Sequence, residues 1–377
     1  MRLDAFTKRV MRKNKSNQSR LPLTISAQYG LVDQITFFNK VVASTDLSNY
    51  YLLKKGEFAY NKSYSSDYPW GAIKRLDNYD QGALSSLYIC FAPQDNVVSD
   101  FILQYFESPK WHKGISEIAV EGARNHGLLN VAVQDFFHTY HYVPKDKKEQ
   151  IKISKLLMLL DERIVTQNKI IDKLQSLIKG ICNNYFEKLS VQEKANLIRL
   201  SDVLKERNEY SSKDGKFIHG TLSKDGIFPK TGRWDRDFLV KQEDKKYKVT
   251  HLDDICYNPA NLKFGVICRN TFGDLIFSPI YVTFEVCKNV NIGFMELYLT
   301  NHNFIEKVRR FEQGTVYERM AVSPEDFLSY KIRIPSYSDQ TFFYKKVQWL
   351  ITLSQNEMKL LSQYKKLRQY LLRQMFI

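Results

Sequence analysis

The stretch KISKLLMLLDERIVTQNKIIDKLQSLIKGI, residues 152–181, lies near the middle of the chain and predicts a long helix. Its apolar residues recur in alternating steps of four and three, the spacing of a helix that packs against another helix along its length. Gln167 takes one position of this series, where a polar residue typically sets the register of a helix pair. The apolar residues that we expect in the seam are Ile153, Leu157, Leu160, Ile164, Ile171, Leu174, Ile178 and Ile181.

The C-terminal segment, residues 338–377, repeats this pattern less regularly. Its apolar residues coincide with those of the first helix when 190 is subtracted from their numbers, as for Phe343 and Ile153. Ser354, Glu357 and Arg368 fall on the seam and interrupt it. The most economical partner of the first helix is therefore this second helix. Its expected seam residues are Phe343, Val347, Leu350, Leu361 and Leu371.

The rest of the chain is also written twice. Tyr60-Asn61 recurs as Tyr257-Asn258 at an offset of 197, and Asp135-Phe136 recurs as Asp326-Phe327 at an offset of 191. The offset falls slowly along the chain, as expected of a duplication with a few small insertions and deletions. Chance matches would scatter, so we interpret the two halves as an internal repeat.

The two blocks that alternate with the helices have the character of strands and turns. Segments such as FAYNKSYSSDYPWGAIKRL and IYVTFEVC are short, aromatic and β-branched, and Gly, Pro, Asn and Asp break them. Each block is predicted to contain one helix, 99–112 or 293–311, then a loop, an Asp-Phe pair and a final strand that closes at a proline.

The predicted fold class is α+β, with two tandem globules separated by long antiparallel coiled-coil helices and related by a pseudo-two-fold axis. The expected domains are a first globule at 1–145, a central helix at 146–190, a second globule at 191–335 and a distal helix at 336–377.

Composition favours a protein with real cores and a polyanionic partner. The 377 residues are 44% hydrophobic, the net charge is +15, and basic residues outnumber acidic ones in each of the four segments. Nucleic acid is the first partner that such a field suggests, and a basic protein that binds no polyanion is the alternative. Five scattered cysteines without a C-x-x-C pair argue against a disulfide framework or structural zinc, so we expect a reducing cytoplasm. No membrane span or signal peptide is expected.

Two segments resemble a known family. Glu149-Gln150, Leu160-Asp161-Glu162-Arg163-Ile164, Gln167 and Lys179-Gly180 look like the central conserved region of type I restriction–modification specificity subunits. The end of the chain, from Asp339-Gln340 to Phe376, looks like the distal conserved region of the same family. The alternation of variable block and conserved helix is similar to that family along essentially the whole chain.

The resemblance implies that each globule is a target recognition domain that reads one part of a split, asymmetric sequence in double-stranded DNA. It also implies that the helices dock two methyltransferase (M) subunits, and that restriction/translocase (R) subunits join for cleavage. S-adenosylmethionine, ATP and Mg²⁺ belong to those partners, and no cofactor is expected in this chain. Family members usually carry a few residues before the first motif, as Val191–Arg199 do before the second. The first block begins at Met1, which suggests a misassigned start or a slightly cropped first domain.

The sequence predicts no catalytic or metal centre of its own. Asn258-Pro259-Ala260-Asn261 lacks the second proline and the aromatic residue of an amino-methyltransferase motif, so a turn is the better interpretation. His138 and His141 have no acidic or cysteine ligand placed beside them. The chain contains no phosphate-binding P-loop.

Candidate DNA contacts lie in two loops and at several strand ends. Each loop combines a glycine with arginine and with side chains that hydrogen-bond base edges, and a solvated loop is the alternative. The loop candidates are Arg124, Asn125 and His126 in the first block and Gln313, Thr315, Tyr317 and Arg319 in the second. The other candidates are Tyr60, Asn61, Lys62, Lys74, Arg75, Arg233, Arg269 and Asn270, with Arg9, Arg12, Lys13 and Lys15 as further phosphate contacts.

These observations favour a non-catalytic DNA sequence-specificity subunit. The alternative from another class is a coiled-coil scaffold that links partner proteins without reading DNA. A free-standing enzyme is disfavoured by the missing motifs.

Overall fold

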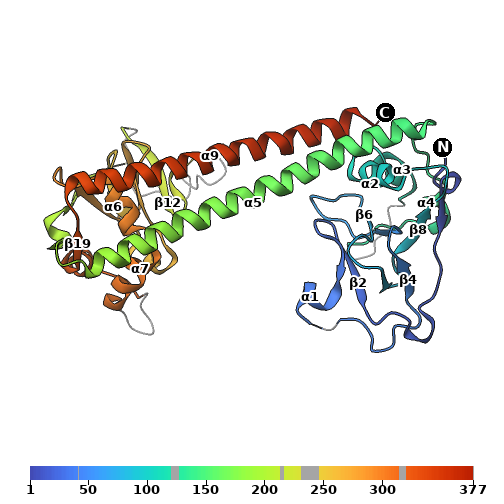
Figure 1. The fold of residues 1–377 in the computed structure, drawn as a ribbon, viewed down its shortest axis with the longest axis horizontal. Helices are drawn as coiled ribbons and strands as arrows, with labels where there is room; N and C mark the ends of the chain where they lie inside the picture. Colours follow the sequence, from blue (N-terminus) through green and yellow to red (C-terminus); the bar gives the residue numbers. More distant parts are fainter. Residues whose placement is uncertain (41, 120–126, 213–215, 231–245, 314–319, 377) are drawn as a thin grey trace. The chain divides into compact units, whose positions relative to one another are not determined.

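The computed structural model describes residues 1–40, 42–119, 127–212, 216–230, 246–313 and 320–376 (Figure 1). The chain forms two compact units, Met1–Lys169 with Lys359–Ile377, and Ile170–Met358. Each unit holds one globule and one half of each long helix, α5 (Lys147–Val191) and α9 (Tyr337–Gln374). The four domains expected from the sequence stay a prediction. No described helix is long and apolar enough to cross a membrane.

The first globule contains two four-stranded sheets. One is antiparallel throughout, in the order β1 (Thr7–Arg9), β8 (Ile89–Pro93), β5 (Phe58–Asn61), β6 (Ala72–Arg75). The other has the order β3 (Gly30–Asp33), β2 (Pro22–Ser26), β7 (Gln81–Leu84), β4 (Tyr51–Lys54), with β2 and β7 parallel. The globule's α-helices are α1 (Gln34–Phe38), α2 (Ser99–Glu107), α3 (His112–Ile118) and α4 (Val133–His138).

The second globule repeats this topology. Its first sheet runs β10 (Leu204–Glu206), β18 (Val282–Val286), β15 (Ile255–Tyr257), β16 (Ile267–Arg269). Its second sheet runs β13 (Gly226–Pro229), β12 (Ile218–Ser223), β17 (Leu275–Phe277), β14 (Tyr247–Thr250), and adds β11 (Tyr210–Ser211) at one edge. The helices α6 (Ile292–Leu299), α7 (His302–Val308) and α8 (Pro324–Ser329) follow in the same order as α2, α3 and α4. The sequence repeat is therefore a structural repeat.

The cores repeat as well, because the same aromatic residues fill them. Tyr60 stacks on Phe136 with ring centroids 5.0 Å apart, and its counterpart Tyr257 stacks on Phe327 at 4.9 Å. Both tyrosines are fully buried. The Tyr60 hydroxyl donates to a backbone carbonyl at 2.9 Å and that of Tyr257 at 3.1 Å, as buried hydroxyls require.

Two details of the predicted elements are wrong. The predicted helix 99–112 ends at Glu107, before Ser108-Pro109, and α3 begins only at His112. The predicted helix 293–311 is divided into α6 and α7, and Asn301 caps α7 by accepting a hydrogen bond from the Asn303 backbone at 3.0 Å. Proline and an asparagine cap both favour a helix break. The Asp-Phe pairs lie in the short helices α4 and α8. The predicted final strand is β19 (Lys331–Ile334), paired with β9 (Asn196–Arg199), whereas the first globule has only the bridge Arg2–Tyr140 at this place.

The fold prediction of globules joined to long antiparallel helices is confirmed, since α5 packs against α9. In the first unit, Asp161 near the start of α5 pairs with Arg368 near the end of α9. In the second unit, the Tyr185 ring near the end of α5 stacks on Phe343 near the start of α9, with centroids 3.8 Å apart. Of the apolar residues expected in the seam, Ile153, Leu157, Ile171, Phe343 and Val347 are buried, and Leu160, Ile164, Leu174, Ile178, Ile181, Leu350, Leu361 and Leu371 are half-buried.

The two long helices are joined to their globules by the same device. The Gln150 side chain accepts from the Val98 backbone N–H at 2.7 Å and donates to the Pro144 carbonyl at 2.7 Å. The Gln340 side chain accepts from the Asn291 N–H at 2.9 Å and donates to the Pro335 carbonyl at 2.9 Å. Both glutamines are 1% exposed. Each buried amide therefore fixes the first turn of a long helix to the residue before α2 or α6.

Candidate nucleic-acid interface

In the first globule, the segment after β5 lies beside the end of a predicted recognition loop. Leu129 donates its backbone N–H to the Lys62 carbonyl at 2.9 Å, and Tyr64 donates to the Gly127 carbonyl at 3.0 Å. Lys62 and its neighbour Asn61 therefore stand where the loop 120–126 rejoins the globule. The loop candidates Arg124, Asn125 and His126 lie outside the described residues.

The second globule places its predicted loop in the corresponding position. Gln313 and Ala321 form an antiparallel bridge with two backbone hydrogen bonds of 3.0 Å. The exposed Gln313 side chain donates to Asp326 at 3.2 Å. The bridge closes the base of the loop 314–319, and Thr315, Tyr317 and Arg319 lie outside the described residues, as does Arg233.

A shallow hollow with basic residues lies at the base of this second loop. Lys307, Arg309, Arg310 and Met320 line it, together with the acidic Glu306 and Glu312. Arg309 pairs with Glu306 at 3.1 Å and with Glu312 at 3.5 Å. The sequence does not indicate Lys307 and Arg310 as DNA contacts, because basic residues on a short helix form no recognisable motif. Arg309 is held by the two glutamates, and backbone phosphates are the fitting ligand for Lys307 and Arg310.

Tyr60 is a correction to the predicted contacts. It is 0% exposed and belongs to the core of the first globule, so its ring is closed to DNA. Tyr60 belongs to the recurring Tyr-Asn pair, and the tyrosine of this pair is a core residue in both globules.

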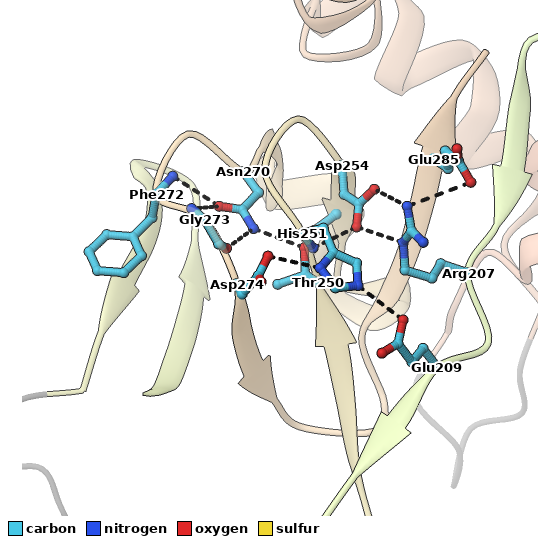
Figure 2. Close-up of polar contacts among 11 residues, drawn as sticks. Arg207, Glu209, Thr250, His251, Asp254, Asn270, Phe272, Gly273, Asp274 and Glu285 are labelled. Carbon is cyan, nitrogen blue, oxygen red and sulfur yellow. Dashed lines mark hydrogen bonds and ion pairs between the residues drawn. The ribbon is translucent and has the colours of Figure 1, made fainter. Parts of the chain in front are cut away.

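Asn270 is also corrected, because it is a loop-fixing residue with 0% exposure (Figure 2). Its amide nitrogen donates to the Thr250 hydroxyl at 3.1 Å and to the Gly273 carbonyl at 2.8 Å. Its oxygen accepts the backbone N–H groups of Phe272 at 3.0 Å and Gly273 at 3.2 Å. All of the hydrogen-bonding groups of this amide are engaged within the protein, so none is left to read a base.

The basic strand ends are held by acidic partners. Lys74 pairs with Glu107 at 2.6 Å, and the largely buried Arg75 pairs with Asp77 and Asp100, each at 2.7 Å. These ion pairs tie β6 to α2 and neutralise the two cations. Lys74 and Arg75 therefore support the packing of β6 against α2, and a DNA contact at either residue stays a prediction.

Arg269 at the end of β16 has the same role in the second globule. Its Nε donates to Asp253 at 2.7 Å, and its Nη1 lies 3.4 Å from Glu296. Burial raises the pKa of Glu296, and Arg269 opposes this shift. A DNA contact at Arg269 stays a prediction, as it does at Arg75.

The basic N-terminal segment is partly engaged. Arg12 pairs with Glu57 at 2.9 Å and donates to the Leu52 carbonyl at 3.0 Å. Lys13 donates to the Asn49 carbonyl at 2.7 Å. Arg9 and Lys15 are exposed, so their side chains are accessible to a phosphate.

The second globule also carries a polar network that sequence reasoning missed (Figure 2). Arg207 donates to both oxygens of Asp254, at 2.9 and 3.1 Å, and lies 3.6 Å from Glu285. The His251 ring lies between Asp274 at 2.8 Å and Glu209 at 3.0 Å. Partial burial lowers the pKa of His251, but these two carboxylates raise it overall. The hydrogen-bonded partners are 23 to 47 residues apart in sequence, so no local pattern indicates them.

This network holds three segments of the second globule together. It joins the segment before β11, the end of β14 and the start of β17, and its cations are matched by carboxylates (Figure 2). Among the described residues no group of three or more His, Cys, Asp or Glu side chains is arranged to hold a metal ion. His141 is buried between the hydroxyl groups of Tyr105 and Thr139, at 3.0 and 2.7 Å.

Neither a protein-family model nor a curated protein sequence matches the chain. Solved structures do match it over its whole length. An S subunit of a type I restriction–modification system from M. genitalium aligns with 100% of this chain and 95% of its own, at 16% identity and a TM-score of 0.56. An HsdS subunit from Thermoanaerobacter tengcongensis aligns with 100% of this chain and 95% of its own, at 12% identity and a TM-score of 0.50.

A third chain comes from a structure that describes complex assembly and conformational transition of a type I restriction–modification system. It aligns with 99% of this chain and 95% of its own, at 12% identity and a TM-score of 0.59. The family resemblance inferred from the sequence is thereby confirmed at the level of the fold.

Proposed function

We propose that this chain, which has the fold of type I restriction–modification S subunits, is the DNA sequence-specificity subunit of such a complex. Each globule reads one half of a bipartite, asymmetric site in double-stranded DNA. The observation that carries the proposal is the duplication: two globules with one strand order, each followed by a long helix, over the whole length that the S-subunit structures match.

Base reading is assigned to the two loops, 120–126 and 314–319, which rejoin their globules at corresponding places. Lys62, Arg310 and Lys307 beside them supply phosphate contacts, which give affinity but no sequence information. The loops themselves differ, with EGARNH in the first and GTVYER in the second. Different side chains read different bases, so the two halves of the site are expected to differ.

The partners follow from the same proposal. Two methyltransferase subunits dock on the helices, and restriction/translocase subunits join the full complex. Large apolar side chains exposed on α5 and α9, among them Leu159, Phe342 and Trp349, support docking by protein partners. S-adenosylmethionine, ATP and Mg²⁺ act in those partners, the chain itself is non-catalytic, and the complex works in the cytoplasm.

The first test is a map of methylated bases in the host genome with this gene intact and deleted. We expect one split adenine-methylation motif to disappear when the gene is deleted and to return when it is restored. A map that is unchanged by deletion, in a host whose neighbouring methyltransferase gene is expressed, would contradict the proposal.

The exposed apolar residues on the helices also favour a second candidate, a scaffold that joins partner proteins without reading DNA. The two functions separate in a binding assay with the purified complex. A specificity subunit retains a preference for one DNA sequence over a scrambled duplex at 150 mM salt, whereas a scaffold shows the same weak, salt-sensitive binding to both.

A further inference from the structure

A charged cluster interrupts the helix seam of the first unit. The Arg368 guanidinium on α9 contacts both carboxylate oxygens of Asp161 on α5, and the Nη2–Oδ2 distance is 3.2 Å. Gln104 on α2, which is 3% exposed, donates to the same carboxylate at 3.1 Å. The Asp161 and Arg368 side chains are 35% and 23% exposed, so water screens the pair only in part.

The second unit has an apolar group at the equivalent three positions. An offset of 193 relates α2 to α6, and an offset of 190 relates the two long helices. Gln104 then corresponds to Leu297 and Asp161 to Ile351, while Arg368 corresponds to Ile178. The second group, Leu297, Ile351 and Ile178, is half-buried and packs against the core of the second globule. The two units thus differ in chemistry at a place where their folds agree.

The difference matters for which helix can pair with which. If α5 paired with α5 of a second copy in the same antiparallel register, Asp161 would face Ile178. If α9 paired with a second α9, Arg368 would face Ile351. In both cases a partly buried charge loses its partner and is covered by an apolar side chain, which is unfavourable. Only the pairing of α5 with α9 matches charge with charge and apolar with apolar.

We propose that Gln104, Asp161 and Arg368 make the seam of α5 selective for α9, and that they exclude a second copy of α5. The partner that this surface fits is a helix with a guanidinium at the position of Arg368. The selection acts on helix pairing alone, so it goes beyond the proposed function and holds whether or not the globules read DNA.

The test uses the full chain with a protease site inserted after Gln192, in the exposed turn that follows α5. Two preparations with different N-terminal tags are cut in the folded state, mixed, unfolded in urea and refolded together. Capture on the first tag is followed by mass spectrometry of the fragments. We expect the first tag to retain the C-terminal fragment and about tenfold less of the second tag than statistical pairing gives.

The triple variant Gln104→Leu, Asp161→Ile, Arg368→Ile gives the first unit the apolar group of the second. In this variant the second tag is expected to rise toward the statistical level. Equal capture of the second tag in the wild type and the triple variant would overturn the proposal.

A second measurement needs no cleavage or refolding. In the intact chain, Asp161→Arg and Arg368→Asp are each expected to lower the Tm by about 3 °C, and the double exchange is expected to restore most of it. The matched control exchanges Lys113 and Glu117, an exposed pair within α3, which is expected to have little effect on the Tm. Single effects on Asp161 and Arg368 that simply add in the double variant would also refute the selection.

Discussion

At the scale of single residues, His141 connects the core of the first globule to pH. Burial lowers its pKa to about 4, and the N-terminal ammonium group adds to the shift. In the unfolded chain the His141 pKa is near its ordinary value of about 6.5. At mildly acidic pH the imidazole is therefore protonated in the unfolded chain and neutral in the folded globule. The contribution of neutral His141 to the free energy of unfolding is therefore complete above about pH 6.5 and is lost as the pH falls toward 4.

This gives a prediction for acid unfolding. Between pH 7 and pH 5 the free energy of unfolding of the first globule is expected to fall by about 2 kcal/mol through His141. Urea unfolding at the two pH values measures it. The variant His141→Gln is expected to be less stable at pH 7 and to show a smaller loss at pH 5, and an equal pH slope in both proteins would contradict the assignment.

Arg124 provides a residue-scale test of base reading. If its guanidinium reads a base, Arg124→Ala alters the methylated sequence in one half of the site and leaves the other half as it was. Sequencing of methylated bases in cells that carry the variant measures this. A uniform weakening at every site would identify Arg124 as a phosphate contact instead, and Arg319→Ala serves as the matched variant for the other half.

At the scale of elements, a buried glutamine at the start of α5 and another at the start of α9 each fix a long helix to its globule. Gln150→Leu leaves the Val98 N–H and the Pro144 carbonyl without their partner in a buried place. We expect a loss of about 2 to 3 kcal/mol in the free energy of unfolding.

Gln340→Leu is expected to cost a similar amount in the second unit, and the exposed Gln175→Leu on α5 is the control. Denaturant unfolding with m-values separates these effects from changes in compactness. A Gln150 variant as stable as the Gln175 control would show that the two hydrogen bonds of the Gln150 side chain contribute nothing to the free energy of unfolding.

The elements also show how far the sequence alone reaches. The alternating steps of four and three predict both long helices, because the seam is local and periodic. The recurring Tyr-Asn and Asp-Phe pairs reveal the duplication, and their aromatic members are core residues in both globules. The ion pairs of Arg75 and Arg269 escape sequence reasoning, since their carboxylate partners follow from the tertiary fold. Of the candidate site, Lys62 and Gln313 stand beside the predicted loops, and the loops themselves remain a prediction.

At the scale of the whole molecule, the helices are proposed to set the distance between the two half-sites. Insertion of one heptad into each helix, after Lys169 and after Met358, where the compact units divide, preserves the seam. Seven residues add about 10 Å of helix, which is about three base pairs of DNA.

The methylated motif is then expected to keep both halves and gain about three base pairs between them. Methylated-base sequencing measures the spacer directly, and a single insertion in α5 alone is the control that mismatches the seam. An unchanged spacer in the double insertion would rule out the helices as the ruler.

The repeated glutamine joint has a consequence for how such a gene can change. Because both globules are fastened to a long helix through the same buried amide, a crossover between the two halves of the gene, or with a related gene, yields a chain whose new globule still meets its helix correctly. The polar cluster around Asp161 would lose only the hydrogen bond from Gln104 in such an exchange. Recombination can thus exchange one globule while both long helices are kept.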